Sequence, residues 1–231
     1  MPDMTRLPER LAAVRERIDA ACARASRDPS EVTLVAVTKT FPLDVLRAVL
    51  DAGLTDLGEN RALEFAEKAE ALCDRPTWHF IGSLQRNKAR EVAEHADLFH
   101  ALDSLRLAKE LNKRARNAGR VLPCLVQVNI SDEDAKHGVA PGALAALLEE
   151  VAAFEHIEVR GLMGMAKLVP PEEREAVVRP QFARLRQLAE SIGRDRLPLL
   201  SMGMSGDFEI AIEEGATHIR VGSALVGRRG D

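Results

Sequence analysis

The sequence lacks tyrosine entirely, and it has one tryptophan, three cysteines and no long apolar run. Without tyrosine, no phenol hydroxyl of this chain can serve as an acid or a base. The cysteines, Cys22, Cys73 and Cys124, are far apart and match no metal-binding or redox spacing, so we expect reduced, buried thiols. No apolar stretch approaches the roughly 20 residues of a membrane-spanning helix. The N-terminal segment also lacks the apolar core of a signal peptide. We therefore expect a cytoplasmic protein that does not bind membranes.

The charge excludes a further class of partner. The net charge is −4, and acidic and basic residues are interspersed along the chain. Nucleic-acid binding requires a basic patch or a strongly basic domain, so we expect no nucleic-acid partner. The hydrophobic fraction of 46% is sufficient for a large core. A length of 231 residues suits one barrel domain spanning residues 1–231.

Short apolar runs alternate with amphipathic helical stretches. An N-terminal helix is expected at 5–25, with one apolar stripe formed by Leu7, Leu11, Val14, Ile18 and Cys22. Eight strands are expected at 32–38, 55–57, 77–81, 97–101, 121–128, 157–163, 198–200 and 217–221. Helices are expected near 42–52, 60–73, 85–95, 104–118, 141–153, 172–192 and 206–214.

This alternation predicts parallel strands joined by right-handed crossovers, and eight strands are the number that closes a barrel. An open doubly wound sheet would need a glycine-rich phosphate loop after the first strand. Residues 38–42, which form that loop, contain no glycine. The sequence therefore predicts a (β/α)8 TIM barrel with an extra N-terminal helix.

Lys39 is the first candidate functional residue because it directly follows an apolar, β-branched strand. In barrels of this kind the site lies at the C-terminal ends of the strands. Desolvation there can lower the pKa of a lysine and make its amine a nucleophile. The alternative is a lysine whose head group stays in water. Polar residues and glycines also occur at the ends of nearly all the remaining strands, which favours the functional interpretation.

Ser201, Ser205, Gly222 and Ser223 follow or end the last two expected strands, where such barrels commonly bind phosphate. The amides of Gly222 and Ser223 would begin a short terminal helix, which favours an anion. The alternative is turn chemistry, with Ser205 as a helix N-cap. A phosphate site together with a lysine suggests a phosphorylated aldehyde or ketone held as a Schiff base, so pyridoxal phosphate and sugar phosphates are both candidates.

The ordered motifs of this chain resemble those of the pyridoxal phosphate homeostasis proteins, which are similar to the barrel domain of bacterial alanine racemases. The matching segments are 34–42, 58–61, 78–88, 128–138, 161–163, 201–205 and 220–227. The resemblance implies a pyridoxal 5'-phosphate cofactor bound to Lys39 as a Schiff base, with Arg220 near the pyridine nitrogen. It implies a phosphate site formed by Ser201, Ser205, Gly222 and Ser223, and a cofactor lining formed by Asn60, His79 and Met202.

Two residues, His79 and Lys136, have alternative interpretations. His79 could equally be a core histidine. Lys136 is either a second cofactor contact or a solvated loop lysine. An arginine facing the pyridine nitrogen would keep its own proton, so the ring would stay unprotonated and be a weak electron sink.

The resemblance implies a monomeric carrier that buffers the cofactor and delivers it to apo-enzymes that depend on pyridoxal phosphate. An amino-acid racemase is the alternative, and it needs an acid or base on each face of the substrate α-carbon. Alanine racemases use a lysine and a tyrosine, and this chain has no tyrosine and ends just after the last strand. A slow racemase that uses His79 or Lys136 stays open. A sugar-phosphate aldolase is a third class, with no proton relay identified.

Overall fold

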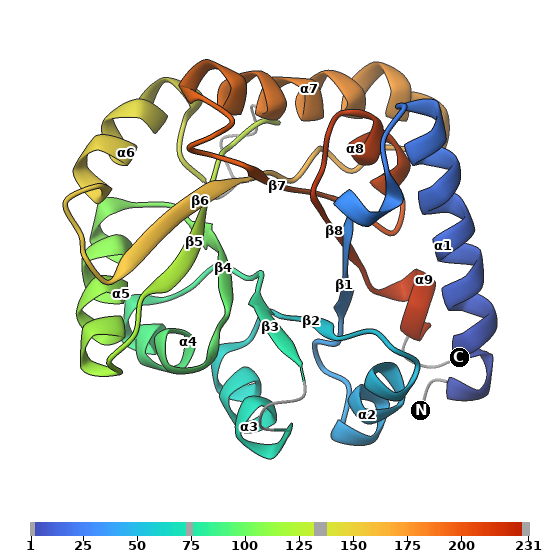
Figure 1. The fold of residues 1–231 in the computed structure, drawn as a ribbon, viewed down its shortest axis with the longest axis horizontal. Coiled ribbons are helices and arrows are strands. Elements are labelled where there is room, and N and C mark those ends of the chain that lie inside the picture. Colours follow the sequence, from blue (N-terminus) through green and yellow to red (C-terminus); the bar gives the residue numbers. More distant parts are fainter. Residues whose placement is uncertain (1–2, 73–75, 132–137, 228–231) are drawn as a thin grey trace.

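The computed structural model describes residues 3–72, 76–131 and 138–227. In these residues, eight parallel strands close a barrel in chain order, and β1 pairs with β8 to complete it (Figure 1). The strands are β1 (Thr33–Val37), β2 (Asp56–Glu59), β3 (Thr77–Phe80), β4 (Leu98–Leu102), β5 (Leu122–Gln127), β6 (Ile157–Met163), β7 (Leu199–Met204) and β8 (His218–Val221). The predicted TIM barrel is confirmed.

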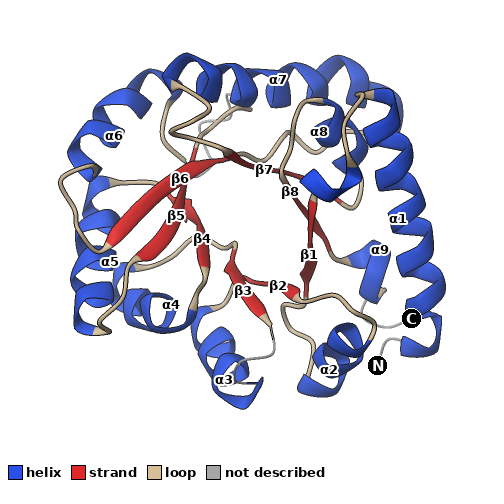
Figure 2. Ribbon diagram, viewed as in Figure 1, coloured by secondary structure: helices blue, strands red, loops and turns tan. Residues whose placement is uncertain are grey.

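Helices surround the ring of strands (Figure 2). They are α1 (Leu7–Arg24), α2 (Leu43–Asp51), α3 (Ala62–Leu72), α4 (Ala89–His95), α5 (Leu105–Asn117), α6 (Leu144–Val151), α7 (Arg174–Ile192), α8 (Phe208–Glu213) and α9 (Ser223–Val226). Short 3-10 turns lie at Met4–Arg6, Pro29–Glu31, Arg86–Lys88, Pro141–Ala143 and Pro171–Glu173. None of the helices in the described residues is long and apolar enough to cross a membrane.

The extra N-terminal helix α1 lies beside α8 and α9 (Figure 1). All five residues of its predicted apolar stripe are buried. The guanidinium of Arg17 lies 4.4 Å from the ring centroid of Phe208 and forms a 2.6 Å ion pair with Glu209. Apolar burial, with this cation–π contact at its edge, therefore fixes α1 across the last β/α unit.

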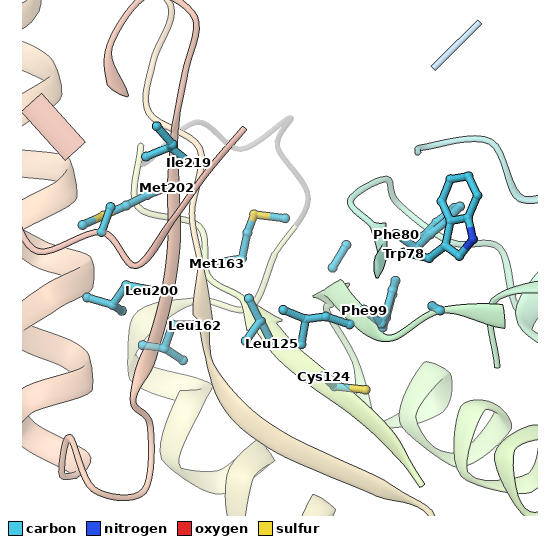
Figure 3. Packing of buried hydrophobic residues seen from close by; sticks show 14 of the residues in the cluster. Trp78, Phe80, Phe99, Cys124, Leu125, Leu162, Met163, Leu200, Met202 and Ile219 are labelled. Atoms are coloured by element: carbon cyan, nitrogen blue, oxygen red, sulfur yellow. The ribbon is translucent and has the colours of Figure 1, made fainter. Parts of the chain in front are cut away.

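The apolar core fills the space between the strands and the helices (Figure 3). Phe65 of α3 packs with its ring centroid 5.5 Å from those of both Trp78 and Phe80. Cys22 and Cys124 are buried free thiols, as expected, and Cys73 lies outside the described residues. The barrel interior is different, because it holds a group of buried polar side chains that the site is built on.

The helix after β7 starts later than the sequence suggests. A helix was expected at 206–214 with Ser205 as a possible N-cap, but α8 begins at Phe208 and Asp207 occupies the N-cap position. The Asp207 carboxylate accepts a 2.6 Å hydrogen bond from the backbone N–H of Met204. This bond closes a turn and leaves Ser205 available to the barrel mouth.

Candidate functional site

A pocket of about 250 Å³ opens at the C-terminal ends of the barrel strands. We call it the mouth pocket. Three of the predicted site residues line it: Lys39, Asn60 and Arg220. They come from the ends of β1, β2 and β8, so barrel closure gathers residues that are far apart in the sequence. The remaining lining residues are Val37, Ile81, Gly82, Ser83, Gln127, Met165 and Met204.

Lys39 follows β1 by two residues, and it is exposed. The sequence suggested a lysine desolvated at the top of the core, and this expectation is wrong for the structure. The strand ends at Val37, so the side chain belongs to the rim of an open pocket. The amine is therefore accessible to a ligand and also to solvent.

The loop that carries Lys39 is fixed from outside the barrel by a buried ion-pair network, which we call the Lys68 clamp. The Lys68 ammonium contacts one carboxylate oxygen of Glu59 and one of Glu64, both at 2.7 Å, and donates to the carbonyl oxygen of Thr38 at 3.0 Å. Glu64 also accepts from the backbone N–H of Thr40. Thr40 has a positive φ of 67°, a conformation that costs a non-glycine residue free energy unless its surroundings hold it.

Arg220 points into the mouth pocket from β8 and is 5% exposed. It donates to Ser201 Oγ at 2.6 Å and to the Gly164 carbonyl oxygen at 3.2 Å. Burial lowers the pKa of Arg220 to about 10, and the charge of Asp207 opposes this shift. The guanidinium therefore stays protonated at neutral pH, and it has further N–H donors beyond these two bonds.

Six of the predicted site residues do not line the mouth pocket: His79, Ser201, Met202, Ser205, Gly222 and Ser223. Their contact with the cofactor stays a prediction. His79 is 2% exposed and hydrogen bonds to His100 and Asp56, an environment typical of a core histidine. The Ser201 hydroxyl is fully buried between His100 and Arg220. Met202 is buried in the apolar cluster near Leu200 and Ile219 (Figure 3).

Of the two methionines in β7, Met204 and not Met202 lines the pocket, because a β-bulge in β7 changes the pairing with β8. Ser201 pairs with His218, whereas Met204 pairs with Arg220. A step of three residues along β7 therefore matches a step of two along β8, so β7 contains one extra residue. Gly203, inside the bulge, has a φ of 91°, and a Cβ there would lie 2.6 Å from the Cβ of Ala211. Only glycine fits this position without strain.

The loops after β7 and β8 meet as the sequence suggested. The Ser205 hydroxyl accepts a 3.2 Å hydrogen bond from the backbone N–H of Gly222. Gly222 is half-buried, and the neighbouring Ser223 is exposed at the start of α9. Ser205, Gly222 and Ser223 thus lie together beside the strand that carries Arg220. Lys136 lies outside the described residues.

Asn60 provides a buried polar atom that no other described residue satisfies. Its side-chain oxygen Oδ1 is buried and has no hydrogen-bond donor among the described residues. Such an atom costs about 1–3 kcal/mol unless a ligand or a water satisfies it. Gly82 allows the segment after β3 to approach Asn60 closely, because a Cβ there would lie 2.6 Å from the Asn60 carbonyl oxygen. Asn60 therefore fits a pocket that receives a ligand.

Several lining residues escaped the sequence analysis: Ile81, Ser83, Gln127, Met165 and Met204. Each lies at or just beyond the end of a strand. Their positions in the sequence predict that they lie near the barrel mouth. Those positions do not predict which side chains point into the pocket. A larger hollow of about 600 Å³ lies on the outer side of the Lys39 loop, beside Lys68. It includes neither Lys39 nor Arg220, so its chemistry is separate from that of the mouth pocket.

The barrel and its pocket place the chain in a known class. The family model of the alanine racemase N-terminal domain matches residues 10–230. An alanine racemase from Clostridium difficile 630 superimposes with a TM-score of 0.71, over 94% of this chain and 60% of its own. The sequence identity is 13%, so this likeness concerns the fold alone.

Closer relatives define the family within this class. A pyridoxal phosphate homeostasis protein from Aquifex aeolicus is 44% identical over 226 residues, which covers 96% of this chain and 97% of the relative. PipY of Synechococcus elongatus PCC7942, solved with PLP bound, is 36% identical with a TM-score of 0.81, over 96% of this chain and all of that one. The chain belongs to the pyridoxal phosphate homeostasis protein family.

Proposed function

We propose that this protein binds pyridoxal 5'-phosphate in the mouth pocket and buffers and delivers it inside the cell. The observation that carries the proposal is the presence of Lys39, Arg220 and the unpartnered Asn60 oxygen in one pocket. When bound, the cofactor supplies an aldehyde with which a lysine amine forms a Schiff base. The amine of Lys39 is the lysine group that the described pocket offers for this.

Each remaining polar group has a definite task in this proposal. Arg220 stays protonated, so it donates to the pyridine nitrogen without giving up its proton. This leaves the ring a weak electron sink, which suits storage better than turnover. Ser205, Gly222 and Ser223 are the proposed phosphate site, and the hydrogen bond from the Gly222 N–H to the Ser205 hydroxyl supports this because it brings the two loops together.

The exposure of Lys39 supports a carrier. A cofactor that must leave again needs an anchor that a second amine or water can reach, and Lys39 lies on an open rim. We propose that the acceptors are apo-enzymes that depend on pyridoxal phosphate, and that the protein acts as a cytoplasmic monomer. The relative named for pyridoxal phosphate homeostasis supports the cofactor and the buffering role.

The first experiment is the absorption spectrum of the protein with pyridoxal phosphate, followed by borohydride reduction and peptide mapping by mass. We expect a phosphopyridoxyl adduct on Lys39 and its loss in Lys39→Ala, with the fold unchanged. Lys167→Ala, which removes another exposed lysine after β6, is the matched control and should keep the adduct. An adduct on a different lysine, or none, would overturn the proposal.

A second experiment separates a carrier from an enzyme. The loaded protein is mixed with an apo-enzyme, and the recovery of that enzyme's activity is compared with the rate of free cofactor release. Recovery faster than free release supports delivery. Recovery limited by free release, or interconversion of alanine enantiomers by the loaded protein, would contradict the carrier.

A further inference from the structure

We propose that His79, His100 and Ser201 are positioning residues, which hold Arg220 toward the mouth pocket through a one-way chain of hydrogen bonds that ends at Asp56. The proposal deepens the proposed function and rests on it for the identity of the ligand. The chain itself is a property of the protein without ligand, so it can be tested separately.

The four links of the chain cross the barrel interior. Arg220 Nη1 lies 2.6 Å from Ser201 Oγ, and Ser201 Oγ lies 2.8 Å from His100 Nδ1. His100 Nε2 lies 2.9 Å from His79 Nδ1, and His79 Nε2 lies 3.0 Å from Asp56 Oδ1. The residues come from β8, β7, β4, β3 and β2. All are buried except Asp56, whose side chain is 28% exposed at the start of β2.

The two ends fix the direction of every link between them. An arginine can only donate hydrogen bonds, and an ionised carboxylate can only accept them. Burial opposes ionisation of Asp56, but the hydrogen bond from His79 keeps the pKa of this carboxyl below its ordinary value. Asp56 is therefore the acceptor at neutral pH, and Arg220 is the donor at the opposite end.

Only one arrangement of protons then satisfies a chain with two neutral imidazoles. His79 donates from Nε2 to Asp56, so its Nδ1 must accept from Nε2–H of His100. The Nδ1 of His100 must accept from the Ser201 hydroxyl, and the Ser201 oxygen accepts from Arg220. Burial lowers the pKa of His100 well below its ordinary value, and the charge of Arg220 acts in the same direction. His100 is thus neutral, as this arrangement requires.

A charged His79 would reverse two links and leave one group unsatisfied. It would donate to His100, which would then donate to Ser201. The Ser201 oxygen would receive two hydrogens, and its own hydroxyl proton would face no other acceptor described in this fully buried site. An unsatisfied buried hydroxyl is costly, so the neutral chain is the favoured state.

The consequence for the pocket is geometric. Ser201 and the Gly164 carbonyl oxygen hold two guanidinium nitrogens, Nη1 and Nη2. The Ser201 hydroxyl cannot rotate away, because it must donate to His100. The orientation of Arg220 is therefore set from the barrel interior, by residues that do not line the mouth pocket.

The test uses the tautomer of each ring as its readout. Long-range ¹H–¹⁵N spectra of the ligand-free protein are recorded at pH 7, with the rings assigned from single His variants. We expect His79 and His100 to be neutral with the proton on Nε2 in both. A proton on Nδ1 of His100, or a cationic His79, would overturn the one-way chain.

The link to the pocket is tested with three variants titrated with pyridoxal phosphate. His100→Phe removes both links and should weaken binding roughly two- to tenfold, the equivalent of one neutral hydrogen bond. His100→Gln can still donate and accept, and should lie closer to wild type. His218→Phe is the control, because the His218 ring lies 5.8 Å and 6.0 Å from those of His79 and His100 but forms no link.

Wild-type affinity in His100→Phe, or equal losses in His100→Phe and His218→Phe, would contradict the positioning role. If the wild-type protein itself shows no binding, the proposed function fails, and the spectra still decide whether the chain exists.

Discussion

Removing the ammonium of Lys68 tests how the Lys39 loop is held. We expect Lys68→Met to destabilise the protein strongly, because Glu59 loses its charged partner inside the fold. Glu59 is fully buried, and the Lys68 side chain is 7% exposed. The second carboxylate oxygen of Glu59 already has no partner among the described residues. The first oxygen would keep only the Thr38 hydroxyl, at 2.8 Å.

The magnitude follows from the cost of an uncompensated buried charge. Removing one partner of a buried ion pair costs about 3–5 kcal/mol, against a typical total stability of about 5–15 kcal/mol. For a chain of this size, that corresponds to a fall in melting temperature on the order of 10 °C. Methionine has a similar length and apolar stem, so little of the loss comes from packing.

The assay is urea unfolding followed by circular dichroism, with Lys68→Met, Glu59→Gln and the double variant. A glutamine at position 59 needs no counter-charge, so the double variant should be more stable than Lys68→Met by about 2 kcal/mol. The difference in free energy of unfolding between wild type and Lys68→Met should also become smaller as the pH falls. Burial raises the pKa of Glu59, against the charge and hydrogen bond of Lys68. Without Lys68 the folded protein takes up a proton on Glu59 at a higher pH than the unfolded chain does.

Two results would refute this reasoning. One is a Lys68→Met variant within 1 kcal/mol of wild type, since the clamp would then carry little of the stability. The other is a double variant as unstable as Lys68→Met, which would show that packing or loop geometry, and not buried charge, causes the loss. In either case the Lys39 loop would have to be held by other contacts.

Three further predictions concern the pocket and the barrel. Arg220→Ala should weaken pyridoxal phosphate binding roughly ten- to hundredfold while Lys39 still forms its adduct, since a charge-assisted bond is worth about 1.5–3 kcal/mol; an unchanged titration would place Arg220 away from the ligand. Burial lowers the pKa of His218 to about 4 from an ordinary 6.5, so between these pH values only the unfolded chain binds a proton at this position. About 3 kcal/mol of stability should therefore be lost as the pH falls from 6.5 to about 4, and the stability of His218→Phe should fall less over the same pH range. Gly203→Ala should lower the free energy of unfolding by about 2–3 kcal/mol. The loss should exceed that of Gly119→Ala, because Gly119 has a φ of 67° but space for a Cβ, and equal unfolding midpoints for the two variants would contradict the close approach at Gly203.

The architecture was accessible from the sequence because it depends on local patterns. Short apolar runs, separated by helical periodicity, identified all eight strands of the described barrel. The stripe on α1 was accessible for the same reason, since helical spacing alone predicts which of its residues are buried. The start of α8 could not be predicted in this way, because it depends on one hydrogen bond that the Met204 backbone N–H donates to the Asp207 carboxylate.

The site was only partly accessible, because strand ends can be predicted but side-chain directions cannot. Lys39, Asn60 and Arg220 line the pocket as expected. The sequence suggests Met202 for the lining, but Met204 is the methionine of β7 that lines the pocket, because the bulge in β7 breaks the simple alternation along the strand. The resemblance implies a phosphate contact for Ser201, whereas its hydroxyl lies between His100 and Arg220. Those partners come from β4 and β8, and no local pattern joins them.

The polar filling of the barrel favours a functional explanation over a structural one. The interior of such a barrel is commonly filled with layers of branched apolar side chains. Here three imidazoles, those of His79, His100 and His218, and the hydroxyl of Ser201 are buried. Buried polar groups must be fully paired to avoid a large penalty, and well-packed apolar residues are often at least as stabilising. Stability alone therefore does not account for this filling. Holding a charged guanidinium in one orientation beneath a pocket does, because that task needs a directed hydrogen-bond partner that an apolar side chain cannot provide.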